Sequence, residues 1–269
     1  MKPLTLTPIK RAFASVALVA ACSTTAWSAD LPDFTFTPSA VGLTGAPVTA
    51  DNILVSDFSS VTSTGATTFA EQGFLSITGF QLGGVNVLAG GLNSTYSLYF
   101  SFNGTGHTTL NAGSNPNTTV TAGVFDTLNY SLIGASGNST FGFMGTTPTV
   151  TSVAPQTLAT GSLISGNVVT SPADGNTAFV PSANATLTFV QAAGKQGFFS
   201  PQPFYNMAFS AFTNPVSTVT PFAGGFIINN GGGAINFAAA VPEPETYALM
   251  LAGLGLMGFV ARRRKHSVI

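Results

Sequence analysis

Between residues 31 and 240, apolar side chains alternate with small polar ones, and this two-residue period limits what the chain can fold into. In the clearest example, Tyr96, Leu98 and Phe100 would lie on one face of a strand. Ser97 and Ser101 would then lie on the opposite face. The same region contains no convincing helical period. The pattern therefore predicts an all-β protein whose strands bury one apolar face.

Breaks rich in Gly, Asn and Pro divide this region into roughly nine to twelve short strands. The breaks fall at 83–84, 90–91, 103–104, 111–117, 175–176 and 231–233. Strands at this spacing favour a single β-sandwich domain over residues 30–240, with a jelly roll as one variant of it. No fixed-period repeat is evident, which argues against a solenoid.

The region between Asp30 and Val241 is acidic and almost free of cations. It contains seven acidic residues and one basic residue, Lys195, which gives a net charge of −6. A surface with one cation cannot neutralise phosphates, so nucleic acid is not expected as a partner. Solubility has to come from neutral Thr, Ser, Asn and Gly residues. Such a surface suits contact with extracellular polysaccharide.

Residues 1–29 have the layout of a secretory signal peptide. Three cations precede an apolar run at 12–21 that has the length of a signal core. This predicts the secretion translocon and signal peptidase as partners, with cleavage in the stretch Ala26–Ala29. A rival interpretation is a lipobox with Cys22 acylated. Cleavage after the signal would discard the only cysteine and leave the mature domain without disulfides.

The last 29 residues, 241–269, contain three elements in order. Pro242, Glu243 and Pro244 come first, and an uncharged apolar run at 247–261 follows. The run ends at four consecutive cations, Arg262, Arg263, Arg264 and Lys265. This is a stop-transfer pattern, so 247–261 is predicted to be a transmembrane helix with its cations on the cytoplasmic side. Its length of about 22 Å is short for a bilayer core of about 30 Å.

The tail resembles the PEP-CTERM sorting domain of Gram-negative bacteria. In that family an integral-membrane exosortase recognises the tail, and export accompanies exopolysaccharide production. The resemblance implies that Pro242, Glu243 and Pro244 are recognised by an exosortase. It also implies a transient inner-membrane anchor, followed by release to the cell surface or extracellular matrix. A plain single-pass anchor with incidental prolines is the alternative.

Several Phe- and Gly-rich stretches look similar to the flocculation-associated PEP-CTERM proteins of floc-forming bacteria. They lie at 34–39, 197–205, 208–213 and 231–237. This resemblance implies a matrix protein that promotes cell aggregation, as in flocculation and biofilms, within secreted polysaccharide. The same stretches also have an ordinary interpretation as strand and turn sequence.

Groups suited to catalysis are scarce, and we expect no enzymatic activity. His107, the only histidine before the tail, falls in a turn-like stretch, and no Gly-x-Ser-x-Gly elbow is present. Asp57 and Glu71 are the best available carboxylate pair for a glycosidase, but the Trp and Arg residues usual in a glycosidase cleft are missing. The alternative to a matrix protein is a secreted carbohydrate-binding or carbohydrate-active module.

The sequence does not predict a well-defined metal site. A zinc site of His and Cys ligands is excluded by counting. Calcium is the more credible ion, because Asp51, Asp57 and Asp174 offer carboxylates in expected loops, although no regular calcium-loop series is present. Calcium that bridges the acidic domain to polysaccharide would make aggregation sensitive to EDTA.

Overall fold

The computed structural model of the protein describes residues 31–200, 206–213 and 215–238. These residues form fourteen strands, joined by hairpins, loops and the short 3-10 helices η2 (Pro38–Val41), η3 (Asp174–Asn176) and η4 (Val216–Thr218). The strands are β1 (Phe34–Phe36), β2 (Val48–Ala50), β3 (Asn52–Ser63), β4 (Thr68–Leu82), β5 (Val85–Val87), β6 (Tyr96–Leu110), β7 (Thr121–Met144), β8 (Thr147–Ala173), β9 (Ala178–Thr188), β10 (Val190–Gln191), β11 (Phe199–Ser200), β12 (Asn206–Thr213), β13 (Val219–Phe222) and β14 (Gly225–Ala238).

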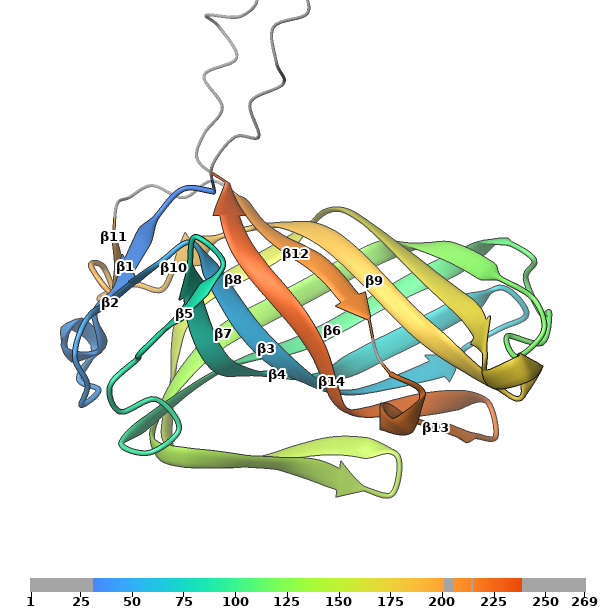
Figure 1. Ribbon diagram of the computed structural model, residues 1–269, viewed down its shortest axis with the longest axis horizontal. Coiled ribbons are helices and arrows are strands. Elements are labelled where there is room, and N and C mark those ends of the chain that lie inside the picture. Colours follow the sequence, from blue (N-terminus) through green and yellow to red (C-terminus); the bar gives the residue numbers. More distant parts are fainter. Residues whose placement is uncertain (1–30, 201–205, 214, 239–269) are drawn as a thin grey trace, which may run out of the picture. The chain divides into compact units, whose positions relative to one another are not determined.

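Eight of these strands form one antiparallel sheet that closes on itself (Figure 1). They pair in the order β8, β7, β6, β4, β3, β14, β12 and β9, and β9 pairs back with β8 through residues 163–173 and 178–187. The short strands β5, β10 and β13 pair at the margins with β4, β8 and β14. Because the sheet is closed, each of the eight strands pairs with a neighbouring strand along both of its edges. No further layer is needed to cover a strand edge.

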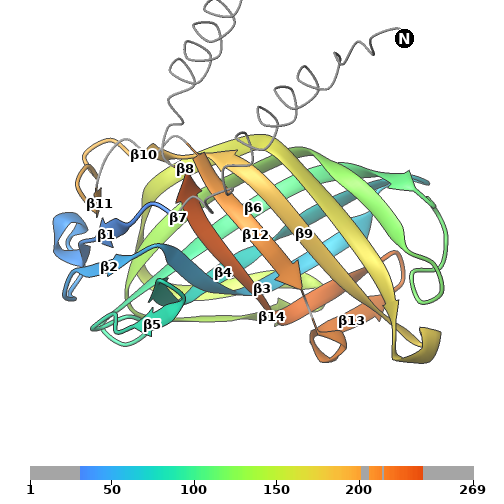
Figure 2. The same cartoon turned by 45° about the horizontal axis from the view of Figure 1, so that its top comes forward.

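The all-β prediction is confirmed, but the sheets are arranged differently from the expected β-sandwich. One large sheet is closed, and a second sheet of only three strands, in the order β11, β1 and β2, covers one of its ends (Figures 1 and 2). A strand in a sandwich and a strand in a closed sheet both bury one face and expose the other. The alternating pattern therefore identifies the strands but does not distinguish these two arrangements.

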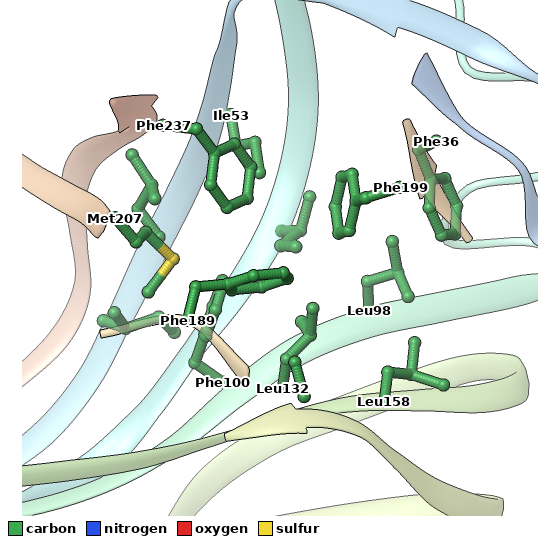
Figure 3. Close-up of a cluster of buried hydrophobic side chains, with 14 of the residues drawn as sticks. Phe36, Ile53, Leu98, Phe100, Leu132, Leu158, Phe189, Phe199, Met207 and Phe237 are labelled. Carbon is green, nitrogen blue, oxygen red and sulfur yellow. The ribbon is translucent and has the colours of Figure 1, made fainter. Parts of the chain in front are cut away.

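The end that the small sheet covers is filled with apolar side chains, many of them aromatic rings (Figure 3). Phe34 and Phe36 from β1 and Phe199 from β11 are fully buried there, together with Phe237 from β14. The rings of Phe199 and Phe237 lie 5.2 Å apart between centroids. Burial of each such ring contributes about 1.5–3 kcal/mol. The aromatic core therefore attaches the small sheet to the inside of the large one.

This core explains three of the four Phe- and Gly-rich stretches of the sequence. Phe34 and Phe36 belong to the stretch 34–39, Phe198 and Phe199 to 197–205, and Phe237 to 231–237, and all five side chains are buried. Their positions support the ordinary interpretation of these stretches as strand sequence with large apolar side chains.

Glycine-rich breaks in the sequence have two different structural roles. Gly83 and Gly84, with φ of 58° and 78°, form the two-residue turn between β4 and β5. The expected breaks at 103–104 and 231–233 are wrong, because both lie inside strands, β6 and β14. At Gly104 a Cβ atom would come within 2.7 Å of the Thr127 carbonyl oxygen, so glycine there permits close strand packing.

Strands β7 and β8 are much longer than the short strands that the sequence suggested, and their connected ends form an arm outside the closed sheet. The arm, residues 137–153, begins and ends near residues with positive φ, Gly137 and Ala154. Phe141 of the arm packs against Phe58 and Tyr99, with centroid distances of 5.3 and 5.4 Å. An aromatic cluster on the outer face therefore holds the arm against the sheet.

Candidate functional site

The end of the closed sheet opposite the small sheet contains a cavity of about 520 Å³. The β3–β4 turn, the loop 113–117 and the β13–β14 turn contribute to its lining. Ala183 and Ala185 of β9 are small side chains among those that line it. Its walls are mostly apolar and include Val61, Phe69, Leu75, Phe102, Phe125, Leu128, Val168 and Ile228.

Asp57, on strand β3, is the most buried acid that lines this cavity. Its side chain is 3% exposed, and it lies between Leu75 of β4 and Gly231 of β14 in the strand register. A β-bulge interrupts β14 here, at Asn230, whose φ is 65°. The Oδ1 atom of Asp57 has no hydrogen-bond partner among the described residues. A buried acceptor without a partner is unusual in a folded protein and calls for an explanation.

Glu71, on strand β4, is the second acid of the cavity. It is half-buried, lines the cavity, and lies opposite Val61 of β3 and Gly104 of β6. Between the two acids the register places Ser59 opposite Gly73. A Cβ atom on Gly73 would lie 2.6 Å from the Cβ of Ser59, so glycine is needed for β3 and β4 to approach this closely.

The environment of both acids favours their protonated forms. Burial raises the pKa of Asp57 well above its usual range, and the nearby Glu71 carboxyl raises it further. Burial also raises the pKa of Glu71 to about 7. The neighbouring Ser59 hydroxyl offsets part of both pKa increases, although its Oγ has no hydrogen bond of ordinary geometry. The two acids therefore form a coupled pair in a largely apolar cavity.

The structure brings together the two residues that the sequence singled out as the best carboxylate pair, Asp57 and Glu71. Sequence reasoning missed Ser59 and Gly73, which lie between them in register. One signal was available, because Asp57 and Ser59 occupy alternate positions of a strand whose other inward residues, Ile53 and Val55, are apolar. Polar residues on an otherwise apolar strand face indicate a site or a cavity.

His107 lies away from this cavity and not in the turn that the sequence suggested. It belongs to strand β6, and its Nδ1 lies 2.8 Å from Oδ1 of Asp126 on β7. Both side chains are more than 40% exposed, at 43% and 49%. An exposed pair of this kind contributes about 0–1 kcal/mol. His107 therefore lies on the outer surface. Among the described residues, its hydrogen-bond partners include no nucleophile.

The three aspartates considered for calcium do not converge. Asp51 accepts a hydrogen bond from the Gly83 backbone N–H at 2.7 Å, Asp57 lies inside the cavity, and Asp174 is exposed at the β8–β9 turn. Within the described ranges, no three His, Cys, Asp or Glu side chains are grouped so as to hold a metal ion.

The predicted signal peptide and sorting residues lie outside the described ranges. These include Pro242, Glu243, Pro244 and the cations Arg262, Arg263, Arg264 and Lys265. The predicted transmembrane helix 247–261 also lies outside them. In the part that the structure describes, no helix is both long and apolar enough to cross a membrane.

Comparison with known families identifies a sorting motif in the chain. The described residues define an all-β protein with a closed sheet and an internal cavity. Residues 240–265 match the PEP-CTERM protein-sorting motif, so the chain carries that motif at its C-terminal end. The motif indicates an exported protein that is targeted by an exosortase and anchored at its C-terminal end before processing. No curated protein and no solved structure matched the chain.

Proposed function

We propose that this protein is a non-enzymatic component of the cell surface or extracellular matrix that promotes cell aggregation together with exopolysaccharide. The observation that carries the proposal is the PEP-CTERM protein-sorting motif at residues 240–265, which indicates export and exosortase targeting. Pro242, Glu243 and Pro244 are the residues proposed for recognition. Membrane insertion through 247–261 precedes release.

The outer face of the closed sheet supports contact with polysaccharide. Neutral side chains form cross-strand pairs on four adjacent strands, β6 to β9. The hydroxyls of Thr105 and Thr127 lie 2.8 Å apart, and the side-chain amide of Asn167 lies 3.5 Å from the Asn184 side-chain oxygen. Hydroxyls and amides both donate and accept hydrogen bonds, as sugar hydroxyls do. Such a face meets a polysaccharide without the repulsion that a dense charge would cause.

The cavity chemistry supports the absence of glycosidase activity. A glycosidase needs polar groups around the sugar as well as its pair of carboxyls. Here the walls around Asp57 and Glu71 are mostly apolar. Sugar hydroxyls placed against such walls would lose their hydrogen bonds to water without replacement.

Two measurements test the proposal. One is intact-mass analysis of the protein recovered from culture matrix, and the other is an aggregation score of cells that carry a sorting variant. The variant replaces Pro242, Glu243 and Pro244 by alanine. The control replaces Pro201, Gln202 and Pro203 by alanine, since this is a Pro-x-Pro segment outside the motif. We expect the wild-type protein to be trimmed near Pro244. Only the sorting variant should remain in the membrane and leave the cells dispersed.

Two results would contradict the proposal. The first is a full-length tail in the matrix with normal aggregation by the sorting variant, which would make the motif incidental. The second is loss of aggregation when Asp57→Asn and Glu71→Gln are combined in correctly exported protein. That result would favour the alternative, a secreted carbohydrate-binding or carbohydrate-active module.

A further inference from the structure

Neither the proposed sorting nor the proposed contact with polysaccharide on the outer face uses the cavity inside the closed sheet. Its acids, its apolar walls and its size together define a ligand class. We propose that the cavity binds a small apolar molecule that carries one amino group, with the ammonium against Asp57 and Glu71. The hydrocarbon part of the ligand lies between these acids and the mouth of the cavity.

The volume and the walls fit the apolar part of such a ligand. A cavity of about 520 Å³ falls within the range of about 300–1,000 Å³ typical of small-molecule sites. Phe69, Phe102, Phe125 and Leu128 present hydrocarbon to this space. A buried apolar ligand would remove both its own surface and these walls from water, which is the main driving force for binding in such a site.

The unpartnered oxygen of Asp57 indicates the polar part. Oδ1 is buried and receives no hydrogen bond from the part of the chain that the structure describes, which is unfavourable because the group has lost its contacts with water. The residue lines the cavity, but Oδ1 itself has almost no accessible surface, so the proposed contact requires the carboxyl group to turn towards the ligand. An N–H donor of the ligand would satisfy this oxygen. Hydrogen bonds that involve a charged donor are the stronger ones.

The charge inside the cavity favours a cationic donor. Among the residues that the structure describes, the titratable side chains that line the cavity are Asp57, Glu71 and Tyr130, and none is Lys, Arg or His. The Tyr130 hydroxyl donates to the Thr188 carbonyl oxygen at 2.8 Å. Repulsion between two carboxyls in one apolar site disfavours ionisation of both, so the pair carries at most one negative charge. One ammonium group balances that charge, whereas a carboxylate ligand would be repelled.

A calorimetric titration of the full-length chain in lipid nanodiscs, with empty nanodiscs as the blank, tests this inference. The probes are 4-phenylbutylamine, 4-phenylbutanol and 4-phenylbutyrate, which share one apolar body and differ in the polar group. We expect the amine to bind at least about tenfold more tightly than the alcohol, since one charge-assisted contact is sufficient for that ratio. The carboxylate should show no measurable binding.

Variants of the chain locate the site. The isosteric changes Asp57→Asn and Glu71→Gln should each reduce the amine-to-alcohol affinity ratio towards one and leave alcohol binding in place. Asp174→Asn, which removes an exposed acid at the β8–β9 turn, should retain the wild-type ratio. Ala183→Phe should abolish binding of both probes, because its ring would occupy the cavity.

Several outcomes would overturn the inference. They are failure of the amine to bind wild-type protein, equal or tighter binding of the carboxylate, and an unchanged amine preference in both Asp57→Asn and Glu71→Gln. Wild-type binding by a correctly folded Ala183→Phe variant would place the ligand elsewhere. Because cell aggregation is not a readout here, these failures are distinguishable from failure of the sorting and matrix proposal.

Discussion

Phe34 packs edge to face against Phe237, with ring centroids 5.1 Å apart and ring planes inclined by 78°. Phe34 lies on β1 of the small sheet, and Phe237 lies on β14, a strand of the closed sheet. Both rings are almost completely buried, at 0% and 1% exposure. The contact therefore joins the first and last described strands of the chain and holds the small sheet over one end of the large one.

Truncation of this contact should weaken the fold strongly. Phe237→Ala removes a buried ring and leaves a cavity, so the free energy of unfolding should fall by about 3–5 kcal/mol. Urea denaturation, followed by tyrosine fluorescence or circular dichroism, measures this change. Leu88→Ala is the control, because Leu88 is 94% exposed and its loss should change stability by less than about 0.5 kcal/mol. Equal effects of the two variants would contradict the described core.

Gly73 should not tolerate a side chain. The Cβ atom of Gly73→Ala would come within 2.6 Å of the Phe58 carbonyl oxygen and of the Ser59 Cβ on the neighbouring strand. The two strands must separate to relieve this clash, so we expect a loss of about 1–3 kcal/mol in unfolding free energy. At Gly142, a strand glycine whose added Cβ would have its nearest contact at 3.9 Å, alanine should have little effect. Thermal denaturation of both variants gives the comparison.

A buried hydrogen bond helps to attach the arm formed by residues 137–153. The hydroxyls of Ser97 on β6 and Ser139 on the arm lie 2.7 Å apart, and both side chains are buried. Ser139→Ala leaves the Ser97 hydroxyl without this partner, so stability should fall by about 1–3 kcal/mol. The double variant Ser97→Ala, Ser139→Ala should lose less than the sum of the two single variants. Additive losses in a urea-denaturation cycle would show that the two hydroxyls do not interact.

Stability should fall as pH rises through the range in which Glu71 ionises. Its carboxyl has a pKa of about 7 in the folded protein, against an ordinary value of 4.5. Between pH 4.5 and pH 7 the folded state binds more protons than the unfolded state. The contribution of Glu71 to folding stability is therefore complete below about pH 4.5 and is lost as the pH rises to 7 and above. The raised pKa of Asp57 acts in the same direction. The expected loss is on the order of 1–3 kcal/mol.

Urea midpoints at pH 5 and pH 8 measure this dependence. Glu71→Gln should reduce the difference between the two midpoints, because the side chain no longer ionises. Asp174→Asn removes an exposed acid instead and should retain the wild-type difference. A steeper pH dependence in Glu71→Gln than in the wild type would contradict the buried-acid interpretation.

Much of the local structure could be predicted from particular residues. Tyr96, Leu98 and Phe100 were expected on one buried face, and all three are fully buried. The turn at Gly83-Gly84 was also expected, because two consecutive residues with positive φ are readily supplied only by glycine. Gly104 has the same local chemistry but lies inside a strand. Only the approach of Thr127 from β7 explains why glycine is needed at that position.

The sequence by itself determined the all-β class, through its two-residue alternation, and the sorting motif, whose elements are contiguous in the last 29 residues. Both are local properties of the chain. Only the tertiary structure decided that β9 pairs back with β8, so that one sheet closes in place of two sheets packing face to face. It also decided that Asp57 and Glu71 share an apolar cavity. Pairing between distant strands sets both features, and such pairing depends on packing of the whole core, which an alternating pattern does not encode.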